Sequence, residues 1–244
     1  MSFWYDGEGI WMWTPATTAK ARLLRREPRC AMYIPPRSGS ELTPATVVHG
    51  HARVYGLHDP VVLALHSPAI AAAMTALAAK EAPSILGYFQ DATRAPARWL
   101  PHDRAVLRIR VAAVHGVESP LASGGVAPAL PGLVPAEIRR RLAGGRRVVV
   151  ASSAAGHPEL QPAVWGAGFT VDLAGSSRPR PGTAVAVTAL DDPGGRPTDV
   201  VGLRLSGSIE DGRLRPVRAT WWHGFEVASA DVPATPSGGF VMPD

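Results

Sequence analysis

The segment 11–30 carries the residues with the clearest chemistry in the chain. Four of them lie at an expected strand-to-helix turn: Thr14, Thr17, Thr18 and Lys20. Hydroxyls, free N–H groups at a helix start and an ammonium together favour the binding of an anion. Lys20 and Lys80 are the only lysines among 25 cationic side chains, and a compact ammonium suits phosphate. The segment predicts a site for a phosphate-bearing cofactor, with an ordinary capped helix as the alternative.

Aromatic and histidine side chains add candidates for the rest of such a site. Trp11 and Trp13 alternate with Met12 and share one strand face, where they could stack on a planar ring or pack in a core. His49 and His51 likewise share one strand face. His58 and His66 follow in sequence, but no carboxylate or cysteine stands in register with these four histidines. We therefore predict no metal site.

The elements that must position these residues follow from alternation, caps and turn residues. A short helix is expected over 17–26, capped by Thr17 or Thr18. A longer helical stretch begins at Pro60 and is expected to break or kink at Pro68. A third helix is expected over 135–143. Strands are expected at 3–6, 9–14, 29–34, 45–55, 104–117, 146–152, 159–166, 168–173, 183–190, 198–210 and 213–228.

Many strands and few helices predict an α+β fold dominated by strands. Residues 118–134 are rich in Gly, Pro, Ser and Ala, which is typical of a linker. We expect a first half over 1–118, a linker over 119–134, a second half over 135–232 and a tail over 233–244. The 244 residues allow two halves of ordinary size.

The order of the motifs resembles the pyridoxamine 5′-phosphate oxidase-like split-barrel family. The residues that carry the likeness are Asp6-Gly7, the run from Thr14 to Pro28, and Val47 to Val54. In the family a Thr/Ser-rich turn leads to a Lys-Ala helix and then to a strand with Gly-x-Ala; here Gly50-His51-Ala52 stands in that strand. The likeness covers residues 3–117. Residues 145–228 give a weaker second copy, in which 202–207 occupies the place of the Gly-x-Ala strand.

Two departures from the family pattern affect what can be carried over. The first half begins at the family's second strand, so its opening strand is missing, and the true start of the chain need not be Met1. The second half has no Thr-x-x-Lys turn, and Ser176-Ser-Arg-Pro-Arg180 stands in its place. Ala19 also replaces an arginine that often precedes the family's lysine. The resemblance thus implies two split barrels, the second degenerate, with one cofactor site between them.

The resemblance implies an FMN-dependent oxidoreductase that transfers hydride or electrons to a small organic substrate. An 8-hydroxy-5-deazaflavin coenzyme is an alternative to FMN, and haem a less favoured one, since split-barrel proteins include a haem-degrading branch. The expected cofactor-binding residues are Thr14, Thr17, Thr18, Lys20, Trp13, His49 and His51. No catalytic side chain is assigned, because the flavin carries the chemistry. A non-catalytic cofactor- or haem-binding remnant remains the rival hypothesis.

Composition narrows the remaining classes. The net charge is +5, but the arginines are spread along the chain without an aromatic-interleaved stripe, so we expect no nucleic-acid partner. No apolar run is long enough for a membrane span, no signal peptide is visible, and Cys30 is the single cysteine. We expect a cytoplasmic protein with no membrane partner. A homodimer or an internal pseudo-dimer would supply the two barrels.

Overall fold

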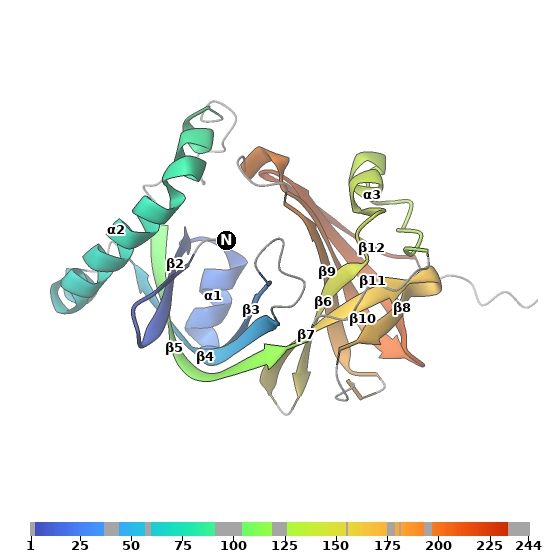
Figure 1. The fold of residues 1–244 in the computed structure, drawn as a ribbon, viewed down its shortest axis with the longest axis horizontal. Coiled ribbons are helices and arrows are strands. Elements are labelled where there is room, and N and C mark those ends of the chain that lie inside the picture. The colour runs from blue at the N-terminus through green and yellow to red at the C-terminus, as the bar shows by residue number, and fades with distance from the viewer. Residues whose placement is uncertain are drawn as a thin grey trace, which may run out of the picture.

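The computed structural model describes residues 3–36, 44–56, 60–90, 104–118, 126–154, 156–174, 179–180, 182–192 and 197–233. Most of the expected tail, part of the expected linker, residues 176–178 and His58 lie outside these ranges. The described strands form two antiparallel sheets, accompanied by three α-helices (Figure 1). The expected strand-dominated α+β class is confirmed at this level.

The first sheet has five strands. Their order is β1 (Trp4–Tyr5), β2 (Gly9–Pro15), β5 (Arg104–Val117), β4 (Ala45–Gly56) and β3 (Arg29–Ile34). Alternation gives the sheet two apolar faces. One face carries Met12, Ala52 and Leu107, and Leu24 of the helix α1 (Ala19–Arg26) packs there. The other carries Trp11, Tyr55 and Val106 and is covered by α2 (Pro60–Gln90).

Helix α2 runs through Pro68 without the interruption that the sequence predicted. A proline inside a helix removes one backbone hydrogen bond and usually kinks it. Here Pro68 lies on the exposed side of the helix. Water can therefore bind the backbone carbonyl that loses its hydrogen-bond donor because proline has no N–H. The buried side chains Ile70, Ala73 and Leu77 hold the helix in place. Packing therefore outweighs the local cost of the proline.

The second sheet closes on itself. Its order is β10 (Val201–Glu210), β9 (Ala184–Asp191), β6 (Arg147–Ala154), β7 (His157–Gly166), β8 (Thr170–Leu173), β11 (Arg213–His223) and β12 (Glu226–Asp231), and β10 also pairs with β11. Six strands thus form a barrel, with β12 added outside β11. The expected strand 213–228 is really two strands, because Gly224 turns the chain at a φ of 57°.

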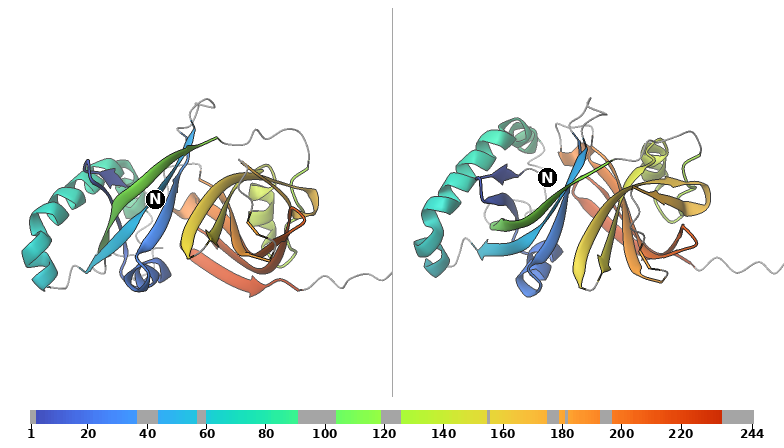
Figure 2. Two further views of the ribbon diagram at one scale, coloured as in Figure 1. Left: turned by 90° about the horizontal axis from the view of Figure 1, so that it is seen from below. Right: turned by 60° about the horizontal axis from the view of Figure 1, so that its bottom comes forward.

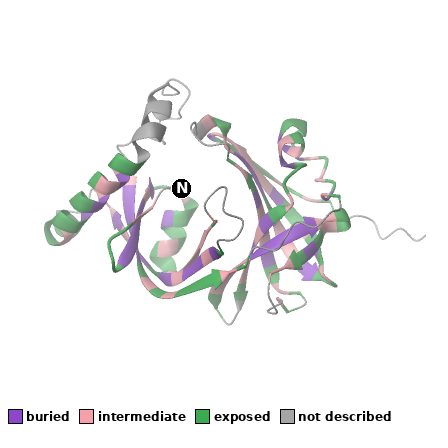
Figure 3. Ribbon diagram, viewed as in Figure 1, coloured by how far each residue is buried: buried purple, intermediate pink, exposed green. Residues whose placement is uncertain are grey.

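The barrel encloses one continuous core. Leu203, Leu205 and Val187 have no exposed surface, and α3 (Ala136–Leu142) adds Ile138 and Leu142 to the same cluster. Short 3₁₀ turns lie at η3 (Ala167–Phe169) and η4 (Pro197–Asp199). Figure 3 shows that the buried residues are concentrated in the strands. Buried apolar side chains from the strands and from α3 therefore pack together inside the barrel.

The two sheets meet along β7. Both β3 and β4 contact this barrel strand, and β5 curves toward it (Figures 1 and 2). Helix α2 covers one end of a face of the first sheet. The barrel contacts the other end of the same face. This arrangement leaves a cleft between the two parts of the chain.

Candidate functional site

The turn before α1 is built as a helix cap. Thr18 is the N-cap residue: its hydroxyl accepts a hydrogen bond from the N–H of Ala21 at 3.2 Å and donates to the carbonyl of Pro15 at 3.0 Å. Thr14 is 5% exposed, and its hydroxyl lies 3.3 Å from that of Thr18. These two hydroxyls therefore have structural partners, which satisfy the start of the helix. Thr17 and Lys20 are exposed.

Lys20 is exposed to solvent, yet desolvation by the surrounding protein lowers its pKa. The exposure of the side chain describes its direct contact with water, whereas the desolvation reflects protein mass at longer range. The ammonium thus lies on an accessible part of the surface with much of the protein nearby.

The register of the first sheet divides the predicted cofactor residues between its faces. Trp13 pairs with Val106 and shares the face of Tyr55, as do His49 and His51 on β4. Thr14 shares the opposite face, with Met12. The seven predicted residues therefore do not converge on one surface of the sheet.

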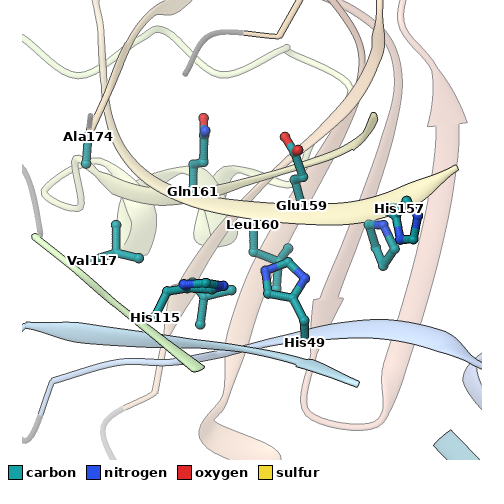
Figure 4. Close-up of a pocket in the computed structure, with 10 residues that line it drawn as sticks. His49, His115, Val117, His157, Glu159, Leu160, Gln161 and Ala174 are labelled. Carbon is teal, nitrogen blue, oxygen red and sulfur yellow. The ribbon is translucent and has the colours of Figure 1, made fainter. Parts of the chain in front are cut away.

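A cleft of about 700 Å³ opens where β4 and β5 meet β7. Its walls are Val47, His49, His115, Val117, His157, Pro158, Glu159, Leu160, Gln161 and Ala174. Of the predicted residues only His49 lies here; His51 is exposed beside it on β4. Figure 4 shows His49 and His115 rising from the first sheet toward β7, with Leu160 reaching down between them. Glu159 and Gln161 point up from β7, on its other side.

A β-bulge brings His115 next to His49. Gly50 pairs with Val111 and His49 with Ala113, so Ala112 is an extra residue on β5. The extra residue reverses the alternation along β5, and His115 turns to the face of His49. The two rings then lie edge to face, with centroids 5.5 Å apart. A side chain at Gly50 would clash with the carbonyl oxygen of Arg110, so the bulge requires glycine there.

Sequence reasoning missed His115 and the β7 residues of the cleft. The alternation of 104–117 carried no sign of the bulge, so His115 had no predicted partner. The expected strand at 159–166 was assigned to the second half, which gave no reason to place it against β4. Gly50 was the only available signal, because a glycine inside a strand often marks a bulge or a close backbone approach.

The remaining candidates have structural roles. Trp11 is 2% exposed and packs on Tyr55, and its indole N–H donates to Asp6 at 2.6 Å. Cys30 is half-buried, and desolvation raises the pKa of its thiol to about 11, so it is no nucleophile at neutral pH. Among the described residues no group of three His, Cys, Asp or Glu side chains is placed to hold a metal ion.

Comparison with known proteins identifies no relative. No family model matches the chain, and neither the curated proteins nor the solved structures contain a match. In the described part of the chain no helix combines the length and apolar character needed to cross a membrane.

Proposed function

We propose that this protein binds FMN or a deazaflavin coenzyme in a split-barrel arrangement and acts as an oxidoreductase on a small organic substrate. The cleft between β4, β5 and β7 is the observation that carries the proposal. Its volume of about 700 Å³ falls within the roughly 300–1,000 Å³ of small-molecule sites. It lies between the five-stranded sheet and the barrel of one chain, as the cofactor lies between two barrels in the family that the sequence resembles.

The residues of the cleft fit a planar ring with polar edges. Val47, Val117 and Leu160 supply apolar surface, while the imidazoles of His49 and His115 can hydrogen-bond to ring heteroatoms. When bound, the flavin supplies the hydride chemistry. The chain's own part is to hold the ring, orient its reactive edge and limit the access of water. No side chain is assigned as an acid or a base.

The sequence predicts that the exposed pair Thr17 and Lys20 anchors the cofactor's phosphate, although the register places this turn at the end of the first sheet away from the cleft and α1 packs on the opposite face. Replacing Lys20 by alanine should weaken FMN binding by about 1.5–3 kcal/mol, the value of a charge-assisted hydrogen bond. Lys80 provides the matched control, because it is the other lysine and its ammonium bonds the carbonyl of Phe3 at 2.8 Å. Quenching of flavin fluorescence on titration measures both variants. Equal affinity in Lys20→Ala, Lys80→Ala and the wild type would remove Lys20 from the site.

The cleft itself is tested by filling it. Leu160→Trp should block entry of the ring and abolish the visible flavin spectrum of reconstituted protein, while the fold, followed by circular dichroism, persists. Protein that takes up neither FMN nor a deazaflavin would contradict the proposal and favour the non-catalytic remnant.

Haem is the second candidate, and the close pair His49 and His115 is the observation that favours it. Either imidazole could serve as an axial ligand at the mouth of the cleft. Reconstitution with haem should then give a Soret band that His49→Ala or His115→Ala shifts or removes. A flavin-binding protein would show no such band.

A further inference from the structure

A band of cations crosses the middle of the first sheet, on the face that the cleft shares. Arg53 on β4 pairs with Arg108 on β5, and in the next row His51 pairs with Arg110. Opposite strands lie about 5 Å apart and alternate residues about 7 Å apart, so these side chains arise from one small rectangle. We infer that Arg53, His51 and Arg110 form a binding site for the phosphate group of a small-molecule ligand.

Cross-strand pairs of like charge destabilise a sheet unless something neutralises them. Arg108 has partners, since its guanidinium lies 3.1 Å from Glu8 and 3.6 Å from Asp6. Arg53 and Arg110 form no ion pair with any residue that the structure describes. Glu27 interacts with the charge of His51 and forms an ion pair with Arg29, the β3 partner of His51. The positive charge left for an anion is therefore that of Arg53 and Arg110.

Two arginines of the band, Arg53 and Arg108, are held in place before any ligand arrives. Trp11 and Tyr55 stack at a centroid distance of 5.9 Å. Arg108 lies 5.2 Å from the Trp11 ring and Arg53 lies 5.3 Å from the Tyr55 ring. Such cation–π contacts restrict the long side chains and lower the entropy lost on binding. Arg53, His51 and Arg110 are nevertheless exposed, so a ligand can reach them.

The size and chemistry of the band favour phosphate on a small molecule. Planar guanidinium groups bind phosphate oxygens in pairs, and imidazole adds a further donor. The rectangle is far smaller than the surface that a nucleic-acid duplex covers. His51 follows His49 by two residues on the same face, so a ligand in the cleft can place its anionic end on this band instead of at Lys20, whose helix packs against the opposite face. The site lies on the opposite face of the sheet from Thr14.

This inference deepens the proposed function and rests on it only for the identity of the ligand. Pyrophosphate and FMN serve as separate probes in calorimetric titrations of the intact chain. Arg53→Gln and Arg110→Gln should each weaken pyrophosphate binding about tenfold or more. Arg204→Gln is the matched control, because Arg204 is an exposed strand arginine on the barrel and should leave affinity unchanged.

The outcomes separate the two proposals. Pyrophosphate binding that depends on Arg53 and Arg110 supports the anion site, whether or not FMN binds. A failure of FMN to bind in that case would contradict only the proposed flavin function. FMN binding that falls with Lys20→Ala but is unaffected by Arg53→Gln and Arg110→Gln, with no binding of pyrophosphate, overturns the anion site and leaves the flavin proposal standing. Tight binding of a DNA duplex without binding of pyrophosphate would also overturn it.

Discussion

The second sheet of this protein closes into a barrel, whereas the first stays open in the described part of the chain, and their faces are used differently. The barrel turns Leu203, Leu205 and Val187 inward, where they fill its interior completely. The open sheet has one face covered by α2 at one end and by β7 at the other. The uncovered stretch between them carries His51, Arg53 and Arg110. Closure thus provides stability, and incomplete coverage provides surface for a ligand.

The two sheets nevertheless share one local device. In each, a strand glycine faces a β-bulge on its neighbour: Gly50 lies opposite the extra residue Ala112, and Gly207 opposite the extra residue Val217. A side chain at either glycine would meet a backbone carbonyl, that of Arg110 or of Arg215. The same device turns His115 into the cleft in the first sheet and only bends the wall of the barrel in the second.

The largest expected effect compares the two cores. Leu203→Ala in the barrel and Leu107→Ala in the open sheet each remove a leucine with no exposed surface. Leucine truncations cost about 2–5 kcal/mol, and the cost is higher where the surroundings cannot collapse into the cavity. We expect the barrel variant to lose more, because a closed ring of strands relaxes less. Urea unfolding followed by circular dichroism measures both. A larger loss of unfolding free energy for Leu107→Ala than for Leu203→Ala would show that the open sheet, and not the barrel, relaxes less.

Much of the secondary structure could be predicted from local patterns. The boundaries of β3 and β5 match the expected strands, because Pro28 and Pro35 flank β3 and the alternation of apolar residues marks β5. The uninterrupted α2 could not be predicted, since tertiary packing of Ile70 and Ala73 decides it. The hairpin of β10 and β11 follows from the turn at Asp211-Gly212, but the closure of the barrel also needs β8 to pair with β11 and β6 with β9, and these distant pairings leave no local signal.

The candidate site was predicted less well than the fold. The cap at Thr18 follows from the residue types at the turn, and the structure has it. The cleft needs three facts that no single segment contains: the bulge at Ala112, the contact of β4 with β7, and the resulting approach of His115 to His49. The cationic band likewise appears only when β4 and β5 are paired in register, because its members on β4 are more than fifty residues from those on β5.

A buried tryptophan in each part of the chain supplies the next comparison. Trp11 donates its indole N–H to the carboxylate of Asp6, whereas Trp165 of the barrel donates to the carbonyl of Gly145 at 2.9 Å. Burial opposes ionisation of Asp6. Hydrogen bonds from Trp11 and from the N–H groups of Glu8 and Gly9, together with the charge of Arg108, outweigh it and lower the pKa of Asp6.

Asp6→Asn should therefore destabilise the protein by about 1 kcal/mol at neutral pH, because Asp6 is exposed to solvent and asparagine keeps one acceptor oxygen. A lowered folded-state pKa stabilises the fold above the ordinary pKa of 3.8, and this stabilisation is lost as the pH falls through the folded-state value. The difference in unfolding free energy between the wild type and Asp6→Asn should therefore shrink as the pH falls below 3.8 and through the folded-state pKa of Asp6. A difference that is constant from neutral pH to acid would rule out the charge of Asp6 as its source.

The paired glycines give an effect that separates stability from binding. Gly50→Ala and Gly207→Ala should each cost roughly 1–3 kcal/mol, because a backbone carbonyl has to move. Only Gly50→Ala should also weaken ligand binding, since it shifts the bulge that orients His115. Gly56→Ala is the control, because nothing lies within 4 Å of the added carbon. Thermal unfolding and ligand titration of the three variants test this prediction. Equal losses of ligand affinity in Gly50→Ala and Gly207→Ala would contradict the role of the Gly50 bulge in binding.

The smallest expected effect concerns the two threonines at the start of α1. Thr18→Ala removes the N-cap and should lower stability by about 1 kcal/mol, whereas Thr17→Ala should leave it nearly unchanged because Thr17 is exposed and outside the cap. The expected effects on FMN binding are the opposite: Thr17→Ala should reduce FMN affinity, whereas Thr18→Ala should not. Unfolding and titration on the same two variants distinguish a capping hydroxyl from a binding one. If Thr18→Ala weakened FMN binding without lowering stability, the hydroxyl of Thr18 would bind the ligand and would not stabilise the helix. The cofactor would then bind through the turn before α1, as the sequence predicts.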